Sequence, residues 1–177
     1  MLKFDEKAIK ADVDEILALR GQVEENVAGI CKDVYKNIFL VGIGGTYAAA
    51  EELMAYLKGH SGISVYVENA ADLVAEGNTK LNAGSVLVIT SVTGNTPEMT
   101  EAANYAKERG AKVLGFVNEK DSPLAKVTDI LFSVQGGAYL KLLVTMLAFM
   151  KEAGEFEDYD CFYRQMANLG DGLVSVQ

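Results

Sequence analysis

Residues 85–98 read SVLVITSVTGNTPE, an apolar run followed by small polar residues, glycine and proline. The apolar run has the length of a β-strand, and its lack of polar alternation is typical of a strand that is covered on both faces of a parallel sheet. Thr96 and Pro97 then give a helix-start signal, because Thr can cap a helix and Pro fits its first turn. This stretch therefore predicts a strand, a loop and a helix, which is the repeating unit of an α/β fold.

The rest of the chain repeats this alternation. Stretches with helical spacing lie at 46–58 and 97–109, and Gly110 is placed to end the second of them. A crossover helix returns the chain to the same edge of a sheet, so the strands on either side of it run parallel. We expect a three-layer α/β/α fold with a five-stranded parallel sheet in the flavodoxin-like order 2-1-3-4-5. Besides 85–91, runs rich in β-branched and apolar residues predict strands at 37–42, 63–67, 112–118 and 129–134.

Helical spacing continues on both sides of these strands. It predicts one long amphipathic helix over about residues 6–35 and two C-terminal helices, over 139–152 and 159–174. The chain has 177 residues and two prolines, neither of them in a linker. Because that length suits one domain, we expect residues 1–177 to form a single domain with a core over about residues 36–155.

Composition excludes several classes of protein. The 16 Lys and Arg against 25 Asp and Glu give a formal net charge of −9, which argues against nonspecific binding of nucleic acid or anionic lipid. The longest apolar stretch, 142–150, is far shorter than the ~20 residues of a membrane helix, and the N-terminal residues lack the apolar region of a secretory signal. Cys31 and Cys161 lie far apart, with no metal-binding or disulfide pattern around them. We expect a cytoplasmic protein with no metal, no nucleic acid partner and no membrane partner.

Two glycine-containing turns mark a candidate binding site. The turn at 42–46 (GIGGT) follows the first predicted strand, and the turn at 91–98 (SVTGNTPE) follows the third. Ligands of open parallel sheets bind beyond the carboxyl ends of the strands where the strand order reverses, and the order 2-1-3-4-5 places these turns side by side there. Glycine lets backbone N–H groups converge on an anion, and a helix start favours negative charge. Either turn alone can be a plain turn or a helix cap, but the pair predicts an anion site.

Known nucleotide motifs do not account for these turns. No Walker lysine follows either of them, and GIGGTY at 42–47 is an incomplete GxGxxG fingerprint. SVTGNT resembles the phosphate loop of flavodoxins, but it follows the third strand instead of the first, and the chain has no Trp to stack on a flavin. An FMN-binding protein is therefore a distant alternative. A DNA-binding regulator is disfavoured because no basic recognition segment precedes the domain.

Three segments together resemble the sugar isomerase (SIS) domain over about residues 36–155: VGIGGTYAAA at 41–50, ITSVTGNTPEMTEAANYAKERGAKVLGFVN at 89–118 and DSPLAKVTDILF at 121–132. Within that family the chain is most similar to the first module of two-module proteins such as the isomerase domain of glucosamine-6-phosphate synthase and fructoselysine-6-phosphate deglycase. The resemblance implies a phosphosugar-binding module of carbohydrate metabolism that uses no cofactor. It also implies the binding residues: Ser91, Thr93 and Thr96 with the backbone of Val92 and Gly94 for the phosphate, and Gly44, Gly45 and Thr46 for the sugar.

The resemblance leaves the catalytic acid and base unassigned. Sugar-phosphate isomerisation needs a positioned carboxylate and an acid such as His, and the two-module relatives carry these in a Glu-x-x-His-Gly-Pro segment of the other module. The corresponding stretch here, 68–78, reads ENAADLVAEGN and has neither His nor Gly-Pro. Glu68 and Glu98 fall at the expected edge, but Glu98 is placed to complement the dipole of its own helix. The only histidine, His60, precedes the second strand and so lies at the opposite edge, roughly 17 Å away along a five-residue strand. Ser122 and Pro123 match the family's Ser-Pro step, which we interpret as a helix cap.

Two hypotheses about function remain open. In the first, the chain is the phosphosugar-binding half of an aldose- or ketose-phosphate isomerase or deglycase, and a second SIS module supplies the catalytic acid and base. A homodimer would bring two phosphate loops together but would still contain no Glu-x-x-His pair. In the second, it is a non-catalytic subunit that senses a sugar phosphate or mediates an interaction. The apolar segment 139–150 and the long first helix offer surface for pairing.

Overall fold

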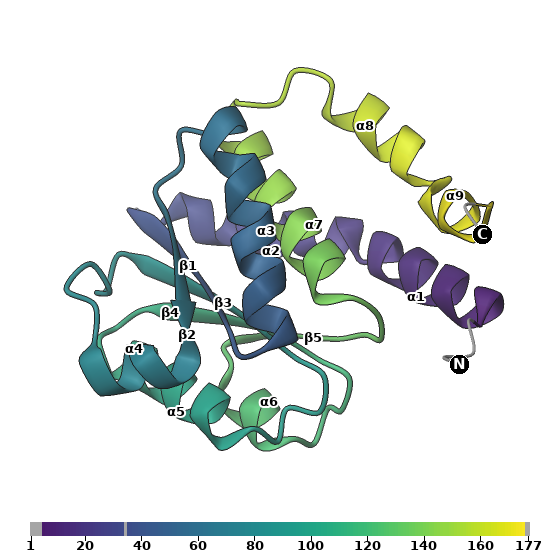
Figure 1. Ribbon diagram of the computed structural model, residues 1–177. Coiled ribbons are helices and arrows are strands. Elements are labelled where there is room, and N and C mark those ends of the chain that lie inside the picture. The colour runs from purple at the N-terminus through teal and green to yellow at the C-terminus, as the bar shows by residue number, and fades with distance from the viewer. Residues whose placement is uncertain (1–4, 34, 176–177) are drawn as a thin grey trace.

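The computed structural model describes residues 5–33 and 35–175, with a five-stranded parallel sheet at its centre (Figure 1). The strand order is β2-β1-β3-β4-β5, which confirms the predicted fold. β1 and β3 are buried along their whole length and pair with Ile38 opposite Val86. This register brings the turns that follow the two strands to one place on the carboxyl edge. The strands are β1 (Asn37–Gly42), β2 (Val65–Asn69), β3 (Ser85–Ser91), β4 (Lys112–Val117) and β5 (Ile130–Ser133).

Helices cover both faces of the sheet. α2, α3 and α7 pack on one face, to which β1 contributes Ile38 and Leu40, while α4, α5 and α6 pack on the other, to which it contributes Phe39 and Val41. Successive side chains of a strand point to opposite faces, so a strand covered on both sides needs a continuous apolar run. The helices are α1 (Glu6–Ala18), α2 (Arg20–Lys32), α3 (Gly45–His60), α4 (Ala70–Glu76), α5 (Pro97–Glu108), α6 (Pro123–Val127), α7 (Ala138–Glu152), α8 (Tyr159–Met166) and α9 (Leu169–Ser175).

The helical segment predicted over residues 6–35 is divided in two at Leu19. The Leu19 N–H donates to the carbonyl of Ile16, three residues earlier, at 3.1 Å, and this tight turn ends α1. The division lets α1 lean away onto α9 while α2 follows α7. Residue 34, which the prediction included, lies outside the described residues.

The last predicted helix, over 159–174, is likewise divided, into α8 and α9. Gly170 lies in α9, where a Cβ would come within 3.2 Å of the Lys10 side chain on α1, so glycine permits the close approach of these two helices. The first and last helices therefore lie side by side, beyond the sheet (Figure 1).

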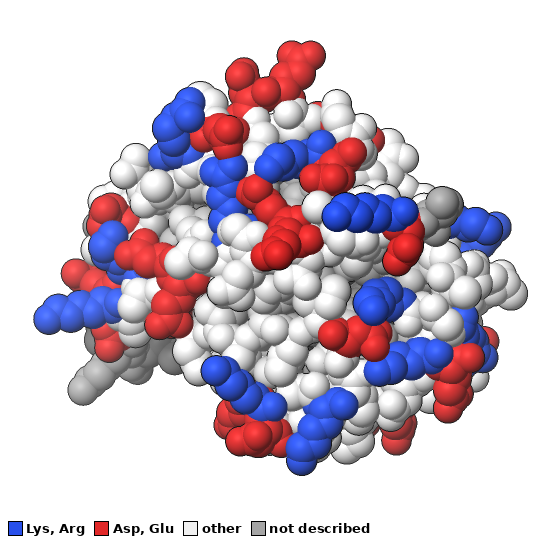
Figure 2. Space-filling view, turned by 180° about the vertical axis from the view of Figure 1, so that it is seen from behind, with Lys and Arg blue, Asp and Glu red and all other residues white. Residues whose placement is uncertain are grey.

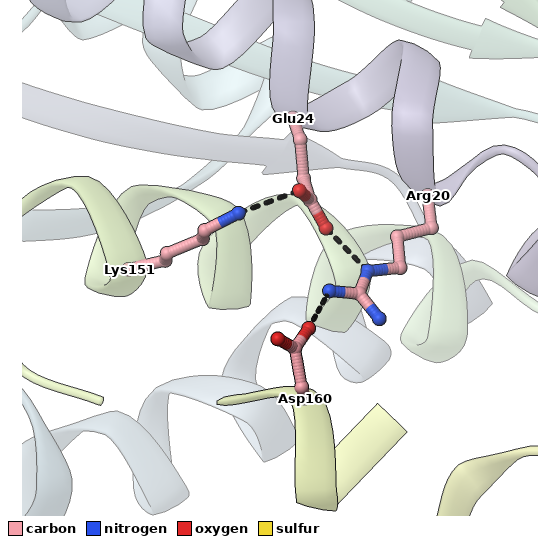
Figure 3. Close-up of polar contacts among 4 residues, drawn as sticks. All are labelled: Arg20, Glu24, Lys151 and Asp160. Carbon is pink, nitrogen blue, oxygen red and sulfur yellow. Dashed lines mark hydrogen bonds and ion pairs between the residues drawn. The ribbon is translucent and has the colours of Figure 1, made fainter. Parts of the chain in front are cut away.

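A polar cluster holds α8 against α2 and α7 (Figure 3). The Arg20 guanidinium donates to Glu24 and to Asp160, and it lies over two tyrosine rings of α8. Lys151 Nζ donates to Glu24 Oε2 at 2.6 Å. Partial burial opposes the charge of Glu24, but the hydrogen bonds from Lys151 and Arg20 hold its pKa below the ordinary value. The cluster therefore joins the C-terminal helices to the sheet domain.

The surface carries charges of both signs. On the face drawn in Figure 2, Lys and Arg are interspersed with Asp and Glu, and no continuous basic patch covers the described part of that face. No helix within residues 5–33 and 35–175 combines the length and the apolarity that crossing a membrane requires.

Candidate functional site

The turns after β1 and β3 open onto one cavity of about 420 Å³. Its third wall is formed by residues 136–138, where α7 begins. The fold thus brings together the two turns that the sequence singled out, and the binding role of their residues stays a prediction. The predicted binding residues that line the cavity are Gly45, Thr46, Ser91, Val92, Thr93 and Thr96.

Glycine and one hydroxyl shape the first turn. A Cβ on Gly42 would lie 2.5 Å from a backbone nitrogen of α3, so only glycine fits there. Gly44 has a φ of 57°, in the left-handed region that glycine adopts without strain. Thr46 Oγ1 donates to the Ile43 carbonyl and accepts from the Ile43 N–H, both at 3.0 Å. The Thr46 hydroxyl therefore holds the turn closed, and so does the Thr46 N–H, which donates to the Ile43 carbonyl at 3.3 Å. The Gly45 and Tyr47 N–H groups of the first turn of α3 have no partner within the helix and are left for a ligand instead.

The second turn keeps more of its polar groups available. Ser91 Oγ accepts from the Gly94 N–H at 3.0 Å, and Thr93 Oγ1 accepts from the Asn95 N–H at 3.2 Å. Both hydroxyls keep their own O–H as a donor. Thr96 is the N-cap residue of α5, but its side chain makes no capping hydrogen bond. The predicted cap role of this hydroxyl is therefore unfilled, which leaves it free to meet a ligand in the cavity.

Two neighbouring segments hold the second turn in place. The Asn118 N–H donates to the Val92 carbonyl, and the Leu124 N–H donates to the Gly94 carbonyl, both at 3.1 Å. A Cβ on Gly94 would lie 2.2 Å from Ser122 Oγ, so the turn sits tightly on the start of α6. Ser122 is the N-cap of α6, and its Oγ accepts a backbone N–H of that helix at 3.3 Å. The helix-cap interpretation of the Ser-Pro step agrees with this geometry.

The electrostatics of the cavity come from helix starts. No Lys, Arg, Asp or Glu belongs to the residues that line it, while α3, α5 and α7 all begin at its walls. A helix start carries roughly half a positive charge, and its first N–H groups lack helical partners. The cavity therefore suits a compact anion although the whole chain has a formal net charge of −9.

The wall at the start of α7 was missed by sequence reasoning. Gly136 has a φ of 91° and Gly137 is the N-cap of α7, so this is a third glycine turn that leads from a strand into a helix. The Gly-Gly pair after the fifth predicted strand was the signal that could have revealed it. Ala138 completes this wall of the cavity.

None of the acid or base candidates lines the cavity. Glu68 lies in β2, which runs two residues later than predicted, and its Oε1 accepts from Asn78 Nδ2 at 2.6 Å. Glu98 lies in the first turn of α5, where it complements the helix dipole as expected. His60 is the last residue of α3, exposed, and stacks on the Tyr56 ring with centroids 4.1 Å apart. The described residues therefore place no titratable side chain on the cavity wall.

A larger hollow of about 690 Å³ lies at the opposite edge of the sheet. Its charged lining residues are Glu25, Asp33 and Lys112, and α2 ends there. The two carboxylates outnumber the lysine, and the C-terminus of a helix also disfavours an anion. The smaller cavity is therefore the better candidate for an anionic ligand.

Comparisons with known proteins point to one family. The SIS domain family model matches residues 34–153. The glutamine–fructose-6-phosphate aminotransferase (isomerizing) of Pyrococcus horikoshii is 27% identical over 154 residues, which are 81% of this chain and 26% of that protein. The 3-hexulose-6-phosphate isomerase of Mycobacterium gastri is 30% identical over 123 residues, which are 66% of this chain and 57% of that protein. The chain thus spans about a quarter of the first relative and little more than half of the second.

Solved structures share the fold at low sequence identity. A candidate phosphosugar isomerase from Bacillus subtilis has a TM-score of 0.74 at 19% identity, covering 85% of this chain and 51% of its own. The Vibrio vulnificus NanR protein, complexed with ManNAc-6P, has a TM-score of 0.59 at 20% identity, covering 93% of this chain and 66% of its own.

Proposed function

The chain belongs to the SIS domain family, and from this premise we propose that it binds a sugar phosphate in the cavity between β1, β3 and α7. The observation that carries the proposal is the convergence of three helix starts on a cavity without charged side chains. Such a site holds a phosphomonoester through N–H and O–H donors, with no need for bulk positive charge. The phosphate would sit against the 91–96 turn and the sugar against Gly45 and Thr46. Gly44 and Gly94 shape these two turns but do not themselves line the cavity.

Ligand-induced stabilisation tests this proposal. A ligand at a hundredfold its dissociation constant stabilises the folded state by ~2.7 kcal/mol, which for a domain of this size raises Tm by roughly 5–10 °C. We expect fructose 6-phosphate or glucosamine 6-phosphate at millimolar concentration to do so, and the unphosphorylated sugars not to. A panel of pentose and hexose phosphates that leaves Tm unchanged would refute the proposal.

We propose that catalysis, where it occurs, depends on a second SIS module or a second copy of this chain. An aldose–ketose isomerisation moves a proton between adjacent carbons and needs a base near them, but no titratable side chain among the described residues lines the cavity. The similarity to a hexulose-6-phosphate isomerase supports an isomerase. Turnover of a ketose 6-phosphate by the purified chain would show that a homo-oligomer supplies the base, and activity that appears only with a second SIS protein would identify a separate module.

An apolar groove supports pairing with a second copy. The groove, about 530 Å³, lies among α1, α7, α8 and α9 and shares Gly137 with the ligand cavity. Leu173 in this groove is 46% exposed. Leu173→Asp should lower the mass measured by light scattering to that of a monomer, whereas Leu131→Asp, at a 36% exposed leucine on β5, should not. A monomeric parent protein would contradict the homodimer.

A sensing role is the second candidate. The fold is shared with NanR, whose structure contains ManNAc-6P, and the cavity without an acid or base fits binding without turnover. Binding of sugar phosphates with no product, alone or with a second SIS protein, would favour this candidate. An FMN-binding role would instead give a yellow protein after flavin is added.

A further inference from the structure

Lys141 is a buried lysine close to the candidate site. It lies one turn into α7, the helix whose start lines the cavity, and its side chain is only 2% exposed. Lysine is rarely buried without a charged partner, and none of the ion pairs in the described part of the chain involves Lys141. Its Nζ donates instead to the neutral Asn118 Oδ1, at 3.2 Å.

Asn118 connects this amine to the second turn. Its side-chain Nδ2 donates to Gln135 Oε1 at 2.7 Å, and its carbonyl accepts from Ser133 Oγ at 3.2 Å. Its main-chain N–H donates to the Val92 carbonyl at 3.1 Å. A group that fixes the Asn118 side chain therefore also fixes the residue that anchors the phosphate-binding turn.

We infer that Lys141 is a positioning residue for the anion site: its ammonium fixes Asn118, which holds Val92 and with it the turn at 91–96. This inference rests on the proposed function, since it concerns how the turn that would bind the phosphate is held in place. The ammonium also adds a buried positive charge one turn into the helix whose start forms one wall of the cavity, and no charged side chain lines that cavity. In a medium that screens charge poorly, such a charge favours an anion in the cavity.

The protonation state of Lys141 agrees with this role. Burial lowers the pKa of Lys141 to about 8, and the carboxylate of Asp12 on α1 opposes that effect. The other elements packed on α7 are α2, α3 and β3, and none of them brings a charge that shifts this pKa. The amine is therefore mostly protonated at neutral pH and loses its charge in mildly alkaline solution, while a phosphomonoester with a second pKa near 6 stays doubly charged.

The first test compares Lys141→Met with Lys120→Met. The control removes an exposed lysine two residues from Asn118, so it matches the loss of charge without touching the buried contact. By isothermal titration with fructose 6-phosphate at pH 7, we expect the Kd of Lys141→Met to rise about tenfold, as for a lost charge-assisted hydrogen bond, and that of Lys120→Met to change less than twofold. Affinity of the parent protein should fall between pH 7.5 and 9.5, and that of Lys141→Met should not.

The second test needs no ligand. Hydrogen exchange of the main-chain N–H of Asn118 should become several-fold faster in Lys141→Met, because the hydrogen bond from this N–H to the Val92 carbonyl is held less firmly once the Asn118 side chain is free. The same exchange rate should stay unchanged in Lys120→Met. Lys141→Gln keeps an N–H donor without the charge, so it should retain Asn118 protection and lose the pH dependence of binding. Equal affinity or equal Asn118 exchange in the parent protein and Lys141→Met overturns the inference. Failure of the parent protein to bind any sugar phosphate overturns the proposed function, and the exchange measurement still decides the role of Lys141.

Discussion

Gly94→Ala is the sharpest probe of the second turn. Gly94 has a φ of 66°, and its carbonyl accepts the Leu124 N–H. A Cβ there would lie 2.2 Å from Ser122 Oγ and 2.6 Å from Ser122 Cβ. Ser122 is buried and caps α6, so it cannot turn aside without losing that cap. The substitution therefore has two separate costs, one in the backbone and one in packing.

The two costs have different sizes. The left-handed conformation costs an alanine about 1–2 kcal/mol, and overpacking against a fixed neighbour adds about 1–3 kcal/mol. A total of about 3 kcal/mol lowers Tm by roughly 6–12 °C for a domain of this size. Relief of the clash by movement of the turn would displace its hydroxyls, so affinity for a sugar phosphate should fall as well.

Urea unfolding of three variants separates these costs. Gly154→Ala is the control for the backbone cost alone, because Gly154 has a φ of 71° and a Cβ there meets nothing within 4 Å. Gly94→Ala combined with Ser122→Gly removes the clashing atoms, and glycine at an N-cap costs only a few tenths of a kcal/mol. We expect the double variant to be about 1–3 kcal/mol more stable than Gly94→Ala, because the overpacking cost is removed. Equal stability of Gly94→Ala and Gly154→Ala would refute the tight contact between the turn and α6.

Three further predictions concern the turn, the buried lysine and the C-terminal helices. Thr96→Val should weaken sugar-phosphate binding by about 1.5–3 kcal/mol with little change in Tm, because the Thr96 hydroxyl makes no capping bond. Thr93→Val should weaken binding and also lower Tm, since it loses the hydrogen bond from the Asn95 N–H. Unchanged calorimetric affinity in both variants would mean that the hydroxyls of this turn do not contact the ligand. Burial lowers the pKa of Lys141 from 10.5 to about 8, so the unfolded chain holds the proton more tightly than the folded chain does. The resulting penalty on folding, roughly 3 kcal/mol below pH 8, should disappear as the pH rises toward 10.5. The free energies of unfolding of the parent protein and Lys141→Met in urea should therefore converge as the pH rises, and a constant difference between them would contradict this. Arg20→Met should lower the free energy of unfolding by roughly 1–2 kcal/mol and speed proteolysis between α7 and α8, because it removes the cation over two tyrosine rings. Asp160→Asn should lower it much less, because the Asp160 side chain is 74% exposed.

The sheet could be predicted from the sequence because the signal for each strand lies within that strand's own residues. The segments of β1 and β3 are continuously apolar, and this pattern is typical of strands that helices cover on both faces. Gly110, with a φ of 79°, ends α5 as expected. The divisions at Leu19 and at 167–168 were missed because hydrophobic spacing runs through both of them. These divisions depend on the packing of α1 against α9, which is a contact between the two ends of the chain.

The site could be predicted in part for the same reason. The turns after β1 and β3 carry glycine, hydroxyls and a helix-start proline in a few residues, so their pattern is visible. The start of α7 contributes only Gly136, Gly137 and Ala138, whose place beside the other turns is set by how α7 crosses the sheet. The contribution of these residues to the cavity could therefore be recognised only from the three-dimensional structure.

Lys141 shows why a positioning residue is harder to predict than a binding residue. A single lysine in an apolar helical segment has the pattern of a surface position, since lysine is normally exposed. Its burial depends on Asn118, which is 23 residues earlier and belongs to another strand end. The cavity itself needs only donors that face a ligand, and these lie in short motifs. The groups that hold those donors in place are identified only from packing between distant segments. Because burial penalises the charged amine, Lys141→Met should be more stable than the parent protein at neutral pH although its affinity falls.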